Sequence, residues 1–252
     1  MNRSRQQFGF TLVEILISLG ILGVIMVSTF NFIDSSVAVS SSANSNNELI
    51  REGQIGQQVV AARLKEACHV FPGGTALTLA TLGFERKNYF TNTFVWTVNT
   101  DPFVAMILPP APGTASDQYR FMAYFAVPRN EWTGVGRATG RNNPGADSRN
   151  DLNTWLIIQY TRLLPSASTI PCAGKPTQAG FAAAITGGGS EILLDYVDIP
   201  ANRNELFQVN ANSIDYDIRL EKTSAGGNVI RVGGSGAESS LRGRIFPVNL
   251  GL

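Results

Sequence analysis

One acidic residue, Glu14, lies near the start of a long apolar segment. A lone carboxylate in lipid costs several kcal/mol unless it finds a partner, so an acid inside a membrane segment indicates a function. The chemistry that suits Glu14 is pairing with a positive group, because an ion pair offsets the cost of burying the charge. Glu14 is therefore the first candidate functional residue of this chain.

The other residues that could do chemistry are few. His69 is the only histidine, and Cys68 and Cys172 are the only cysteines. These counts exclude His-rich zinc sites, four-Cys zinc sites and clusters held by four thiolates. A catalytic base would have to be His69, which lies at the end of a predicted helix and is expected to cap it. We expect no enzyme activity, no bound metal and no cofactor.

Four aspartates on or near predicted strands are candidate calcium ligands. Asp215 and Asp217 lie on one face of a predicted strand, and Asp195 and Asp198 lie near the end of another. Calcium prefers such oxygen ligands. Calcium is the alternative, and solvated strand faces are the favoured explanation of these carboxylates.

The segment from Arg129 to Asn150 is the best candidate for binding an external partner. Its four arginines against Glu131 and Asp147 give a local charge of +2. Arginines beside an aromatic residue can hold nucleic acid through phosphate contacts and stacking. The candidate DNA-binding residues are Arg129, Trp132, Arg137, Arg141 and Arg149. The alternative, an ordinary solvated loop of a lysine-poor protein, is the favoured one.

Charge is balanced over the whole chain, which has 252 residues, 20 of them basic and 19 acidic. A net charge of +1 gives no global field for holding nucleic acid. Hydrophobic residues make up 44% and charged residues only 15%, so a core can form under a surface of uncharged polar residues. This surface is typical of proteins outside the cytoplasm, and 25 Gly with 12 Pro predict strands and turns.

The apolar segment that contains Glu14 is long enough to cross a membrane. Its uncharged part, Ile15 to Ile33, would span roughly 28 Å as a helix, close to the thickness of the hydrocarbon core. Arg3 and Arg5 precede it and the next basic residue is Arg51, which places the N-terminus in the cytoplasm and the remainder outside. A buried helix of a soluble protein is the weakest alternative, because apolar runs of this length are rare at the end of a soluble chain.

A cleaved secretory signal is the second alternative. Small residues at Ser41, Ser42 and Ala43 could precede a cut that releases a soluble binding protein beginning at Asn44. However, the apolar run exceeds the roughly 7 to 15 residues of a signal core, and Glu14 lies inside its start.

The residues around Glu14 resemble the N-terminus of type IV prepilins, which include the type IV pilins and the pseudopilins of type II secretion. The shared features are a short basic leader, Gly9 before the cut, Phe10 as first mature residue and Glu14 as the fifth. An unbroken apolar helix follows, and the resemblance covers about residues 3 to 34. In this family a membrane aspartic peptidase cuts after the glycine, and the new N-terminus is methylated.

The resemblance implies cleavage between Gly9 and Phe10, N-methylation of Phe10 and a role for Glu14 in assembly. Gly9 has no side chain to obstruct a peptidase. Glu14 could pair with the Phe10 amine of a neighbouring subunit, which would fix the axial register of that subunit. The implied partners are the prepilin peptidase, other major and minor pilins, the inner-membrane assembly platform and the membrane, with DNA added by the basic segment.

Four regions are expected along the chain. They are a leader at 1–9, a transmembrane helix at 10–33, a polar linker with an amphipathic helix at 34–71, and a globular β-rich head at 72–252. Poor helix formers dominate Asp34 to Asn47, which predicts a weakly helical or locally melted segment. Apolar residues then repeat at three- and four-residue steps from Leu49, which predicts an amphipathic helix to about Cys68.

Alternating patterns after Gly74 predict strands. The clearest is Ser213 to Lys222, and the turn residues Ala225 to Asn228 predict a hairpin with Val229 to Val232. The other predicted strands are Ala76 to Leu82, Thr91 to Val98, Phe103 to Leu108, Gln118 to Val127, Thr154 to Leu164, Glu191 to Val197 and Leu241 to Val248. A long N-terminal helix, half transmembrane and half amphipathic, packed on a mostly antiparallel sheet is α+β in class.

Both cysteines are expected outside the cytoplasm, where disulfides form. A Cys68–Cys172 bridge would tie the helix end to the central loop, and two unpaired buried thiols are the alternative. The large head and the last strand with Arg244 to Asn249 are similar to the bigger minor pilins and the J-type pseudopilins. The expected function is that of a minor pilin, anchored in the inner membrane and then assembled into a cell-surface or periplasmic filament for adhesion, motility or DNA uptake. The alternative within the same resemblance is a J-type minor pseudopilin of type II secretion.

Overall fold

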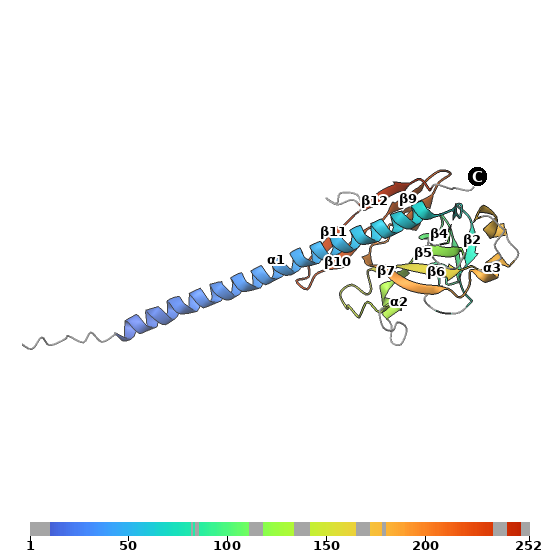
Figure 1. Ribbon diagram of the computed structural model, residues 1–252. Coiled ribbons are helices and arrows are strands. Elements are labelled where there is room, and N and C mark those ends of the chain that lie inside the picture. Colours follow the sequence, from blue (N-terminus) through green and yellow to red (C-terminus); the bar gives the residue numbers. More distant parts are fainter. Residues whose placement is uncertain are drawn as a thin grey trace, which may run out of the picture.

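The computed structural model describes residues 11–81, 83, 86–110, 118–133, 142–164, 172–177, 180–233 and 241–247. A single helix, α1 (Leu12–Glu66), extends over 55 residues, and its second half packs on a β-rich head (Figure 1). Its first half projects away from the head with every residue from Leu12 to Ile33 exposed. The predicted α+β architecture, a long N-terminal helix on a mostly antiparallel head, is confirmed.

Helix α1 differs from the prediction in its middle. It continues through Asp34–Asn47 without a break, although Ser, Asn, Asp and Val are each roughly 0.5 kcal/mol less favourable than Ala in a helix. These propensities alone predict a weak or melted segment, whereas the structure has a regular helix there, whose Ala38 and Ser42 contact the head. The helix ends at Glu66, and Ala67 is already extended.

The described strands of the head form one large antiparallel sheet and two small ones. The large sheet has seven strands in the order β1-β4-β5-β6-β7-β10-β11. Its strands are β1 (His69–Val70), β4 (Phe103–Leu108), β5 (Arg120–Pro128), β6 (Trp155–Leu163), β7 (Gly189–Val197), β10 (Leu220–Thr223) and β11 (Val229–Val232). The small sheets are β12 (Arg242–Ile245), β9 (Ile214–Asp217) and β8 (Phe207–Val209), and β2 (Ala76–Thr78) with β3 (Val95–Thr97).

The core lies where α1 crosses the large sheet. Strand β4 is buried at all six positions, which explains its continuous apolar sequence. Helix α1 contributes Leu49, Val60 and Leu64, each with no exposed surface. Gly56 lets the helix approach the sheet closely, because a Cβ there would lie 2.4 Å from a methyl carbon of Leu194. Short helices complete the head: α2 (Arg129–Thr133), α3 (Phe181–Ala184), and the 3₁₀ helices η3 (Cys172–Thr177) and η4 (Arg203–Glu205).

The strand predicted over Ser213 to Lys222 is wrong as a single element. Residues Ile214–Asp217 form β9 in the three-stranded sheet, whereas Leu220–Thr223 form β10 in the large sheet. The chain changes sheets at Ile218 and Arg219, and the alternating pattern runs across this change. The hairpin after it is confirmed, since β10 and β11 pair from Leu220 opposite Val232 to Thr223 opposite Val229.

Candidate functional site

Glu14 forms part of a cap at the start of α1. Its Oε2 accepts hydrogen bonds from the backbone N–H of Thr11, at 2.8 Å, and from the Thr11 hydroxyl, at 2.9 Å. The backbone N–H of Glu14 donates in return to Thr11 Oγ1 at 3.3 Å. This reciprocal pair is a capping box, and the negative charge suits the positive end of the helix dipole. Sequence reasoning missed Thr11, although the Thr-x-x-Glu spacing is the signal of such a cap.

The helix that follows presents apolar side chains on all sides. Leu12 is 75% exposed and Phe32 is 72% exposed, and the large apolar residues between them are also exposed. Within the described part of the chain, α1 is the one helix long and apolar enough to cross a membrane. An exposed apolar surface of this size requires lipid or partner helices. Gly9 and Phe10, the predicted cleavage and methylation residues, lie outside the described residues.

A disulfide joins the end of α1 to η3. It links Cys68 to Cys172, whose Cα atoms are 6.0 Å apart. The backbone N–H of Cys68 also donates to the Ile107 carbonyl at 2.9 Å, which fixes the helix end on the edge of the large sheet. The bridge therefore connects two segments that are 104 residues apart in the chain.

His69 does not cap the helix, contrary to the prediction. Ala67 occupies the C-cap position, and His69 begins β1, where it pairs with Ile107. Its ring packs edge-on against Phe71, with the ring centres 4.9 Å apart. Burial lowers the pKa of His69 below its ordinary value, which favours the neutral ring. Extended backbone after Ala67 leaves the histidine no helix end to cap.

Arg129, the first predicted DNA-binding residue, is instead buried. Only 1% of its surface is exposed, and it forms ion pairs with Asp151 and Asp195. The Asp195 carboxylate accepts from the Arg129 Nε at 2.8 Å and from a terminal nitrogen at 3.1 Å, and the Gly145 carbonyl accepts at 3.0 Å. Tyr196 lies beside the guanidinium, with its ring centre 5.0 Å away. Arg129 is thus a structural cation that is not placed to contact a phosphate.

The buried arginine cluster also reaches helix α1. The carboxylate of Glu52 accepts a hydrogen bond from the backbone N–H of Asp195 at 2.8 Å. Burial raises the pKa of Glu52 above its ordinary value, although this hydrogen bond opposes the shift. Through Asp195, the helix is therefore connected to Arg129 and to the segment that follows it.

The other predicted DNA-binding residues do not form a described surface with Arg129. Trp132 is 2% exposed and donates from Nε1 to the Asn142 carbonyl at 2.6 Å, so it cannot stack on a base. Arg149 is exposed, and Arg137 and Arg141 lie outside the described residues. The interpretation of Arg129 and Trp132 as ligand-binding residues is therefore corrected.

Most of the aspartates that were candidate calcium ligands form hydrogen-bonded ion pairs with arginines. Asp215 accepts from Arg244 at 2.6 Å and 2.9 Å, and Arg219 donates to Asp217 at 2.6 Å. Asp195 pairs with Arg129. The part of the chain that the structure describes holds no group of three or more His, Cys, Asp or Glu arranged for a metal ion.

Residues 4–30 match the family model of the prokaryotic N-terminal methylation motif, a span that contains Gly9, Phe10 and Glu14 and continues into α1. Searches of curated proteins and of solved structures found no match. The motif implies processing by prepilin peptidase and assembly with other pilins, and the apolar helix fits an anchor in the inner membrane with the head outside the cytoplasm. The chain therefore carries the N-terminal methylation signature of the type IV prepilins, which are structural proteins.

Proposed function

We propose that this protein is a minor pilin, cleaved after Gly9, methylated on Phe10 and built into a type IV pilus. The observation that supports this best is the continuity of the methylation motif with an apolar helix that is exposed on all sides up to Ile33. The large head, set on the second half of the same helix, supports a minor rather than a major subunit. The protein acts as a structural subunit in adhesion, motility or DNA uptake by the filament, without enzyme activity.

Glu14 is the proposed assembly residue. Among the described residues, both donors to its carboxylate are neutral groups of Thr11, so no described cation neutralises its charge. Cleavage before Phe10 creates a positive amine four residues away along the chain. We infer that the amine of a neighbouring subunit binds Glu14 in the filament, because an ion pair in lipid costs less free energy than two separate desolvated charges.

The first test is processing of a Gly9→Leu variant. We expect the precursor to remain uncut in the membrane, because a branched side chain obstructs the approach to the scissile bond. Gly20→Leu is the matched control and should be processed normally, since a Cβ at Gly20 meets nothing within 4 Å. Mass spectrometry of the mature N-terminus should find methylated Phe10 in the wild type. An N-terminus at Asn44 would instead show a conventional secreted protein, and normal maturation of Gly9→Leu would contradict the proposed leader.

The second test separates the charge of Glu14 from its capping role. Glu14→Val and Glu14→Gln should enter the membrane as well as the wild type, or better, because each removes a charge. Both should be depleted at least about tenfold from sheared filaments, which corresponds to the loss of about 1.4 kcal/mol of pairing energy. Thr11→Val keeps the carboxylate and should still assemble. Immunoblots of membrane and sheared fractions measure this, and loss of Glu14→Val from the membrane fraction would contradict the assembly role.

A further inference from the structure

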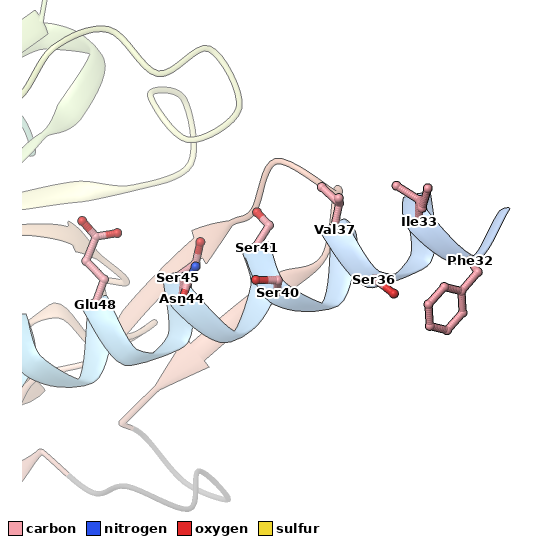
Figure 2. Close-up of a pocket in the computed structure, with 9 residues that line it drawn as sticks. All are labelled: Phe32, Ile33, Ser36, Val37, Ser40, Ser41, Asn44, Ser45 and Glu48. Carbon is pink, nitrogen blue, oxygen red and sulfur yellow. The ribbon is translucent and has the colours of Figure 1, made fainter. Parts of the chain in front are cut away.

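The regular helix over Asp34–Asn47 lies beside the hairpin β10–β11. The turn of this hairpin, Ser224–Asn228, contacts the helix at two places. The side-chain amide of Asn228 donates to the Ser42 hydroxyl at 3.1 Å. A Cβ placed on Gly226 would lie 3.6 Å from the Cβ of Ala38, so the backbone of the turn lies close against the helix. Figure 2 shows the hairpin running alongside this part of α1.

Small residues on one side of α1 receive the hairpin. Within Asp34–Asn47 the partly buried positions are Ala38, Ser41, Ser42 and Ser45, and the other residues of the segment are exposed. These four follow three- and four-residue steps and so share one helix face. Leu49, four residues after Ser45 on the same helix face, is fully buried. The hairpin is thus the described part of the head that supports this weak helix where it leaves the core.

The hairpin is fixed from its base as far as Ser224, which is 1% exposed, and Asn150 holds Thr223 through two hydrogen bonds of 2.7 Å and 3.1 Å. Only the residues beyond Ser224 form an exposed tip. Leu220 and Val232, which pair at the base, are buried in the core. Lys222 adds an ion pair with Glu48 of α1 at 2.9 Å. At the tip, Ala225 to Val229 are exposed, and Gly227 has a φ of +80°. A few weak contacts at an exposed tip are characteristic of elements that open locally without unfolding the core.

We propose that the β10–β11 hairpin is a latch that keeps residues 34–47 helical. While its tip contacts Ala38 and Ser42, α1 is one rigid rod that fixes the head relative to the apolar segment. When the tip is released, the propensities of the Ser- and Asn-rich residues dominate, and the segment becomes a flexible joint. The latch is a property of the head and helix in one chain, so it does not depend on the proposed filament role.

The test compares the same substitution on two faces of one helix segment. Ala38→Trp introduces a side chain that does not fit between α1 and Gly226, and it forces the tip away. Ala43→Trp is the matched control, because Ala43 is exposed and faces away from the hairpin. Amide hydrogen exchange of the full-length protein in detergent micelles is the measurement. We expect amides at 35–47 to exchange about tenfold faster or more in Ala38→Trp, with Ala43→Trp like the wild type.

Two further variants keep the result interpretable. Asn228→Ala removes only the hydrogen bond to Ser42 and should speed exchange at 38–45 by about fivefold. Ser36→Ala with Ser40→Ala raises helix propensity at exposed positions and should restore protection to Ala38→Trp without restoring the latch contact. In all variants the amides of β5 and β6 should stay protected.

Three results would overturn the latch. In the first, residues 35–47 of the wild type exchange as fast as an unprotected chain. In the second, Ala38→Trp and Ala43→Trp exchange at equal rates. In the third, Ala38→Trp exposes β5 and β6 while Asn228→Ala changes nothing, which would make the hairpin part of the core and not a separate element.

Discussion

Replacing Arg129 with alanine is expected to lower the free energy of unfolding of the head by about 3 to 5 kcal/mol. The substitution leaves the partly buried carboxylates of Asp151 and Asp195 without the buried cation that they share, and it removes the donor to the Gly145 carbonyl. Removing one partner of a largely buried ion pair costs more than the pair contributes, because the remaining partly buried charges lose their counter-charge. Denaturant unfolding followed by tryptophan fluorescence measures the change.

Arg149→Ala is the matched control for this experiment, because Arg149 belongs to the same basic segment but is exposed. We expect its effect to stay within about 0.5 kcal/mol. Arg129→Lys should recover only part of the loss, since an ammonium group cannot donate to Asp195 through two fixed nitrogens as the guanidinium does. Equal effects of Arg129→Ala and Arg149→Ala would contradict the structural role of Arg129.

Removing the disulfide should have an effect of similar size. In the chain-entropy account, a bridge that closes a loop of about a hundred residues stabilises by about 4 to 5 kcal/mol, and Cys68 and Cys172 are separated by 104 residues. The double variant Cys68→Ala/Cys172→Ala should therefore unfold at a clearly lower denaturant concentration. Reducing agent should shift the wild type toward the variant and leave the variant unchanged. A wild-type midpoint that is insensitive to reduction would refute the stabilising role.

Local patterns predicted the elements whose structure is decided locally. The apolar run Phe103–Leu108 predicted β4 to the residue, and the glycine-rich turn predicted the β10–β11 hairpin. The change of sheet at Ile218 was not predictable, because a strand that continues and a strand that crosses to another sheet can show the same alternation. The helix through Asp34–Asn47 likewise contacts a hairpin 186 residues later in the chain, and helix propensities do not include such a contact.

In the candidate site, too, the sequence predicted the feature that is decided locally and missed the one that is decided by folding. Glu14 stands out in the sequence because a carboxylate is costly among apolar residues, and this cost is independent of the fold. The sequence of the basic segment, by contrast, does not indicate which carboxylates pair with its arginines. Arg129 is neutralised by Asp195, 66 residues further along the chain, and a local count of charges cannot include a residue brought close by folding.

The place where the head first meets α1 also sets its height above the bilayer. Ala38, which contacts the hairpin turn, lies five residues after Ile33, the end of the uncharged run. Five helical residues rise about 7.5 Å, and the headgroup layer is roughly 5 to 8 Å thick on each side of the hydrocarbon core. With the apolar segment centred in the membrane, the turn therefore lies among the lipid headgroups. The exposed residues Ala225 to Asn228 carry no charge and suit that layer, so the surrounding lipid becomes part of the environment in which the hairpin contacts the helix.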